Sequence, residues 1–241
     1  MRGGELEAAL EVGRLAVGSA DLVLQAVDRA GSRPPDIVDE AVWAVLDQVP
    51  AVLATGDRAL AAWLLDRAQQ WSVPGPAERP RRVHGRVVHD RAAFLWGQMR
   101  EPAPADRALA EQHVRRVFET AAMAVGIRRE LRDPSDPATV RDRASSLLQA
   151  AEITTAVMMD PASGVEALSL AAAELQALPD GQLAVDVLME TPDLRNTDIP
   201  RRMEAPDLPD RAVLLARALE DIVPQVVARQ RRAGPWPRLK P

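Results

Sequence analysis

Proline spacing is the feature that most constrains this fold. Twenty prolines and thirteen glycines interrupt the 241-residue chain. Because proline is tolerated at the start of a helix but not in its interior, their positions outline where helices can begin and end. They bound about nine segments of helical length, with apolar residues at the spacing of an amphipathic helix. These predicted helices cover residues 5–30, 36–49, 58–72, 88–100, 105–132, 138–159, 164–177, 182–190 and 210–232.

The segments between the predicted helices are rich in proline. Residues 73–86 are predicted to form a loop, residues 191–209 an irregular segment and residues 234–241 a flexible tail. Residues 182–190 alternate as a strand would, but an isolated strand has no partner, so a helix is favoured. We therefore expect one all-α domain over residues 1–233.

The first predicted helix carries apolar side chains on more than one side. They occupy about 240° of its helical wheel, and a polar stripe takes the rest. Such a helix must be covered on two sides, which predicts a buried N-terminal helix at the centre of the array. A subunit interface on this helix is the alternative. Residues 138–159 show the same pattern, because Ile153 points nearly opposite to Val140, Ala144 and Leu148.

Missing residue types exclude much enzyme chemistry. The chain has no cysteine, which removes thiol nucleophiles, cysteine-based metal sites and disulfides. Its single lysine is Lys240, so the Walker A lysine and Schiff-base chemistry are excluded from the body of the chain. No metal-binding motif is present either, and we expect no metal and no cofactor. Scarcity of lysine, asparagine and tyrosine is also what a GC-rich coding sequence produces.

Positive charge gathers in residues 78–91, where five arginines and two histidines accompany only two acids. Arginine has a planar guanidinium that suits phosphate, sulfate or carboxylate, and histidine can move a proton near neutral pH. We expect an anion site in which three arginines bind the substrate and two histidines act in catalysis: Arg81, Arg82, Arg86, His84 and His89. The alternative is a solvated basic loop that pairs with the acidic remainder of the chain.

Four further residues are candidates for a pocket around this stretch. Trp63 and Trp96 lie on the helices before and after it and could bind the apolar part of a substrate. His113 falls on the apolar face of its helix, and Glu152 lies at the edge of another. Either could act as a catalytic base if it lines a cavity. For Trp63, Trp96 and His113 the alternative is ordinary packing within a helical core, and for Glu152 it is a side chain that bends out to water.

These patterns predict a metal-independent enzyme of the lyase, cyclase or transferase type that acts on an anionic small molecule. The alternative is a non-catalytic helical interaction protein or accessory subunit, and homo- or hetero-oligomers are possible under either hypothesis. The formal net charge of −5 disfavours nucleic acid as a partner, and a DNA-binding module is the third option considered. No run of 18 apolar residues occurs, so we expect no membrane partner and a cytoplasmic location.

Overall fold

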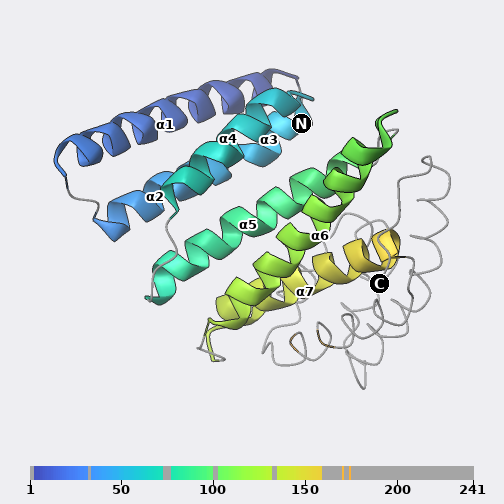
Figure 1. Ribbon diagram of the computed structural model, residues 1–241. Coiled ribbons are helices and arrows are strands. Elements are labelled where there is room, and N and C mark those ends of the chain that lie inside the picture. The colour runs from blue at the N-terminus through green and yellow to red at the C-terminus, as the bar shows by residue number, and fades with distance from the viewer. Residues whose placement is uncertain are drawn as a thin grey trace, which may run out of the picture. The chain divides into compact units, whose positions relative to one another are not determined.

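The computed structural model is all-α in the part of the chain that it describes. In that part it has seven helices and no strand, which confirms the predicted fold class (Figure 1). Leu170 and Glu174 are helical, as predicted for residues 164–177. The count of nine helices stays a prediction, because 182–190 and 210–232 lie outside the described residues, as do 191–209 and 234–241. The described residues are 3–31, 34–72, 77–99, 103–131 and 135–158, with Leu170 and Glu174.

Contacts within the chain group it into two compact units, Met1–Arg91 and Ala92–Pro241. The division falls inside helix α5 (Glu78–Gln98). A single domain over residues 1–233 stays a prediction. None of the described helices is both long and apolar enough to cross a membrane.

The first unit contains α1 (Gly3–Arg29), α2 (Pro35–Leu46), α3 (Val49–Ala54), α4 (Arg58–Trp71) and the first part of α5. Helix α1 packs against α2 and α3, and α2 and α3 in turn pack against α4 (Figure 1).

The ends of these helices follow the local sequence. Gly31, with φ of 69°, follows the end of α1, and Pro35 is the first residue of α2. The Asp57 carboxylate accepts a hydrogen bond from the Leu60 N–H at 3.0 Å and so caps α4, which begins at residue 58 as predicted. Single residues therefore set the helix boundaries at these points.

The described side chains of α1 are buried on one side of the helix and exposed on the other. Gly13, Ala20, Leu24 and Val27 are buried, whereas 65% of Leu15 and 68% of Leu22 stay exposed. The prediction of a buried central helix is therefore wrong for the described side chains of α1. The physical reason is that α2 and α3 cover one side, and the second apolar side of the helix remains in contact with solvent.

Helix α5 begins ten residues before the position expected from the sequence. Residues 78–86, which were predicted to be loop, form its first turns. Pro80 is the third residue of the helix, where its missing N–H is no loss because the first four N–H groups have no partner within a helix. The basic stretch is therefore helical, and the predicted loop of 73–86 is corrected over these nine residues.

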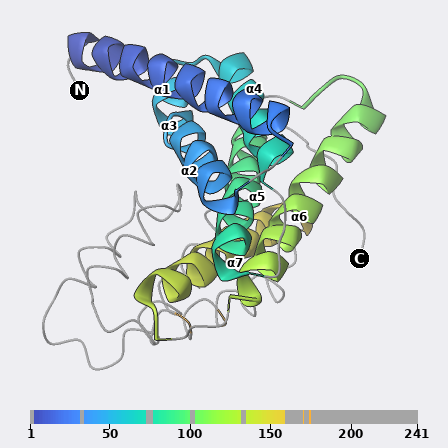
Figure 2. The same cartoon turned by 90° about the vertical axis from the view of Figure 1, so that its left-hand side faces the viewer.

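The second unit contains the end of α5 with α6 (Arg107–Arg129) and α7 (Pro137–Met158). Helices α6 and α7 pack closely against each other and cross at an angle (Figure 2). Val140, Ala144 and Leu148 on one side of α7 and Ile153 on the opposite side are all buried. This confirms the prediction that α7 is covered on both sides.

Helix α7 also buries polar side chains, which is unusual for a core helix. They recur at three- and four-residue steps, so a polar stripe runs along the buried surface of the helix. Its members are Thr139, Asp142, Ser145, Ser146, Gln149 and Glu152.

Candidate functional site

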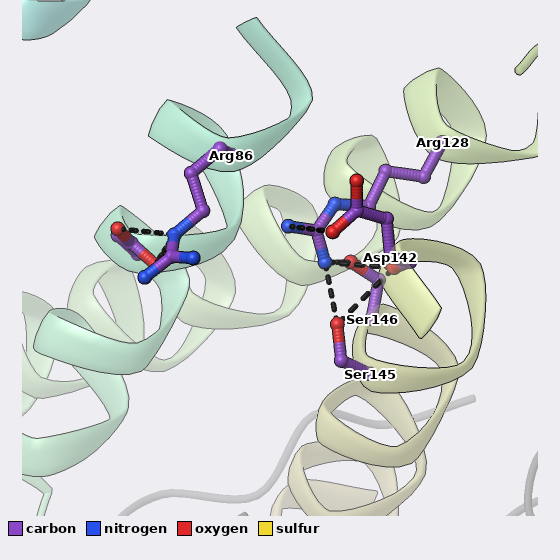
Figure 3. Close-up of polar contacts among 6 residues, drawn as sticks. Arg86, Arg128, Asp142, Ser145 and Ser146 are labelled. Carbon is purple, nitrogen blue, oxygen red and sulfur yellow. Dashed lines mark hydrogen bonds and ion pairs between the residues drawn. The ribbon is translucent and has the colours of Figure 1, made fainter. Parts of the chain in front are cut away.

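The predicted anion-binding residues all lie on α5, and several arginines of this stretch meet the chain's own carboxylates. Arg86 Nε lies 2.9 and 2.8 Å from the two carboxylate oxygens of Asp90, one turn along the helix (Figure 3). Its guanidinium also lies over the Trp43 ring at 5.8 Å. Arg91 Nη1 donates to Asp66 at 2.7 Å. This is the pattern expected of the alternative, in which basic residues pair with the acidic remainder.

Arg79, which the sequence analysis did not select, contacts three acids at the start of α2. Its guanidinium nitrogens lie 3.3 Å from Asp36, 3.6 Å from Asp39 and 2.5 Å from Glu40. Asp39 is buried, and burial raises the pKa of its carboxyl although Arg79 opposes the shift. Arg79 therefore compensates an acidic cluster, a role that its position in a basic run did not reveal.

The remaining predicted residues of this helix are partly or fully buried. Arg81, Arg82 and His84 are half-buried, and His89 is buried. Ser72 Oγ lies 3.0 Å from His84 Nδ1, so the hydroxyl can donate to the neutral ring. Burial lowers the pKa of His84. A neutral imidazole bonded to a serine is suited to proton transfer but equally to ordinary packing.

Trp63 lines a groove, but on the side of the unit formed by α1, α3 and α4. The groove has a volume of about 260 Å³ and is mostly apolar. None of the predicted arginines or histidines lines it. It is lined by Gly13, Arg14, Val17, Gly18, Gln48, Val52, Leu60, Trp63 and Leu64.

A cation–π stack sits on the helix that carries Trp63. The Arg67 guanidinium lies 5.6 Å from the Trp63 ring and 5.5 Å from the Trp71 ring, and it pairs with Asp21 of α1 at 3.1 Å. Arg67 therefore links α4 to α1 and holds the two tryptophans around a charge that is already neutralised.

In the second unit the structure brings together two predicted residues. The Trp96 indole Nε1 donates to Glu152 Oε1 at 2.6 Å, and both side chains are buried. The residues are 56 positions apart in sequence. A buried carboxylate held by an indole N–H is a candidate proton acceptor and is also a stable structural bond.

His113 binds the backbone next to Trp96. Its Nε2 lies 3.1 Å from the Leu95 carbonyl oxygen, so this nitrogen carries the proton and donates. Burial lowers the pKa of the ring, which keeps it neutral near pH 7. Because Nε2 donates, the basic lone pair of the neutral ring lies on Nδ1, and the catalytic role of His113 stays a prediction.

Arg128 is a buried cation that the sequence analysis missed. Only 2% of it is exposed, and its Nη1 donates to the Asp142 carbonyl at 2.7 Å and to two hydroxyls, Ser145 at 2.6 Å and Ser146 at 2.8 Å (Figure 3). Its Nη2 lies 3.7 Å from the Asp142 carboxylate. The sequence does carry a sign of this burial, because Arg128 follows Val117, Ala121 and Ala124 at helical spacing on the buried side of α6.

Among the described residues no group of three or more acidic or histidine side chains is arranged to hold a metal ion. A scan against family models found no match, and searches of curated proteins and of solved structures found none either. The arrangement of this chain's own residues therefore carries the functional argument.

Proposed function

We propose that the chain is a helical interaction protein, an accessory subunit that docks on a partner through α1. The observation that supports this proposal is the exposed apolar side of this helix. Leu15 is 65%, Leu22 68% and Val23 44% exposed, and none of them lies on the side that packs against α2 and α3. Large apolar side chains exposed on one side of a helix are typical of a docking site.

The energy available from this surface supports the proposal. Burying a leucine side chain fully stabilises a structure by about 1.5–3 kcal/mol. Leu15 and Leu22 have about two thirds of that burial still to make, so each can add on the order of 1–2 kcal/mol on docking. That is enough for these two side chains to dominate a modest interface.

The internal use of the chain's charged groups also supports an interaction role. Arg79, Arg86 and Arg91 pair with carboxylates of the same unit, and Arg128 is held among hydroxyls. Under this proposal they stabilise the helical framework that presents α1. The predicted cytoplasmic location, single domain and nine helices remain part of the proposal.

The test is the molar mass of the purified chain by light scattering, alone and with the proteins encoded beside it. We expect a mass above that of the monomer, and we expect Leu15→Glu with Leu22→Glu to abolish it. The matched control is Leu109→Glu with Met123→Glu, which places the same charges at exposed apolar residues of α6. A monomer that takes up no neighbouring protein, or equal loss in both variants, contradicts the proposal.

A second candidate function is a metal-independent enzyme acting on an anionic small molecule, and the Trp96–Glu152 pair favours it. This pair sets a predicted base beside a predicted substrate-binding residue. Arg81 and Arg82 would hold a phosphate, sulfate or carboxylate. Its test is a thermal-shift screen with these anions. We expect a rise in the melting temperature that Arg82→Ala removes, and no rise with any anion contradicts the enzyme hypothesis.

A further inference from the structure

We infer that the partner of α1 is a second copy of this chain, bound in antiparallel orientation. This inference rests on the proposed function, because it names the occupant of the same helix surface. Three properties of the surface point to self-association: the spacing of its apolar residues, the alternation of their size and the position of the charges at its two ends.

The exposed side of α1 has the spacing of a two-helix seam. Leu15, Ser19, Leu22 and Ala26 follow one another at alternating steps of four and three residues, and all four are exposed. This is the heptad pattern by which two helices interlock along their length. It differs from the seam of Gly13, Ala20, Leu24 and Val27, which is already used against the neighbouring helices. In the part of the chain that the structure describes, the helix thus carries two seams, one packed against α2 and α3 and one exposed.

Large and small residues alternate along the unused seam. In an antiparallel pair centred between Ser19 and Leu22, Leu15 of one chain faces Ala26 of the second copy, and Leu22 faces Ser19. Each leucine then meets a short side chain, so that the two helices can approach closely and interlock. Because the operation is a two-fold rotation, every such contact occurs twice.

Charges at the two ends of the seam distinguish the two possible orientations. Glu11 and Arg29 are eighteen residues apart, which is five full helical turns, so both lie at the same flank of the seam. Both are exposed. Antiparallel pairing places Glu11 of one copy beside Arg29 of the second copy at each end. In a parallel pair the same flank of the two copies lies on opposite sides of the interface, so Glu11 meets no Arg29. Charge complementarity therefore selects the antiparallel arrangement.

The size of the seam sets the expected affinity. From Glu11 to Arg29 it is about 28 Å long at 1.5 Å per residue, and a helix is about 10 Å wide, so each copy contributes on the order of 300 Å². A standard stable interface uses about 800 Å² per partner. The seam is well below that size, so we expect a weak dimer with a dissociation constant on the order of 100 μM, which exchanges with monomer at ordinary concentrations.

The experiment is sedimentation velocity on the full chain from about 1 to about 200 μM, a span that brackets the expected affinity. The wild type is expected to shift from monomer to dimer. Glu11→Arg and Arg29→Glu are each expected to raise the dissociation constant about tenfold, since both symmetry-related pairs become repulsive. The double variant Glu11→Arg/Arg29→Glu restores opposite charges across the interface and is expected to return within about twofold of wild type.

The outcomes separate this inference from the proposed function. A wild-type chain that stays monomeric throughout overturns the inference. Single variants that dimerise as tightly as the wild type also overturn it, because this is the behaviour of a parallel pair, in which Glu11 does not meet Arg29. A double variant as weak as the single variants overturns it too, because opposite charges across the interface would then not restore the affinity. If the monomeric chain still binds a neighbouring protein and loses it with Leu15→Glu/Leu22→Glu, the proposed function stands with a different partner. Circular dichroism of every variant confirms that α1 is still helical.

Discussion

Replacing the indole of Trp96 tests whether the buried bond to Glu152 holds the second unit together. Trp96→Phe keeps an aromatic ring but removes the N–H that donates to the carboxylate at 2.6 Å. The carboxylate stays buried, where a charged group that loses a donor is costly. Glu152→Met replaces the carboxylate by an apolar side chain of similar length, and combining both changes leaves an apolar pair.

The expected magnitudes follow from the burial of both groups. A hydrogen bond to a charged group contributes about 1.5–3 kcal/mol, and the smaller ring costs on the order of 1 kcal/mol of packing. Trp96→Phe should therefore lower the free energy of unfolding by about 3 kcal/mol, or roughly 6–12 °C in melting temperature for a chain of this length. In the background of Glu152→Met the same change should cost only about 1 kcal/mol.

The assay is urea unfolding of the wild type, both single variants and the double variant, followed by far-ultraviolet circular dichroism. The coupling free energy from this cycle should be about 2 kcal/mol. A coupling below about 0.5 kcal/mol would refute the reasoning, because the two side chains would then act independently. Enzyme activity is not needed for this measurement, so it applies under either proposed function.

Two further changes in stability follow from burial and helix geometry. Burial lowers the pKa values of His84 and His113, so the unfolded chain binds protons more readily than the folded one. The free energy of unfolding should therefore be constant above about pH 6.5 and should fall as the pH drops below it. Urea midpoints measured over this pH range should lose the slope when both residues are replaced by glutamine. Gly18→Ala should raise the unfolding free energy by about 1 kcal/mol, since its Cβ meets no atom within 4 Å. At Gly13 an added Cβ would clash with the side-chain oxygen of Gln48, so Gly13→Ala should not give this gain. Equal gains at both positions in thermal melts would contradict this account.

Helix boundaries could be predicted where a single residue type decides them. Pro35 and Asp57 act on the backbone next to them, so their effect does not depend on the rest of the fold. Pro80 shows the limit of this reasoning, because a proline is compatible with a loop and with the first turn of a helix. Whether a loop or a helix forms depends on whether Val83 and Val87 can pack into a core. Both side chains are buried in the structure, and the segment is helical.

The candidate site was less predictable because its contacts are tertiary. Periodicity placed Trp96 and Glu152 each on a helix face, but nothing local pairs residues on α5 and α7. The same holds for Arg79, whose acidic partners lie on α2. The burial of α1 was overestimated for a related reason. A helical wheel shows how much apolar surface a helix has, but not how many other helices pack against that surface.

The continuity of α5 across the division at Arg91 constrains how this protein can be made and dissected. A fragment that stops at the division ends in mid-helix and leaves the last carbonyl groups of that helix without partners. During synthesis, the last helix of the first unit is complete only after Gln98 has left the ribosome. Any fragment designed to isolate one unit should therefore carry all of Glu78–Gln98, and a cut inside this helix should expose apolar surface and favour aggregation.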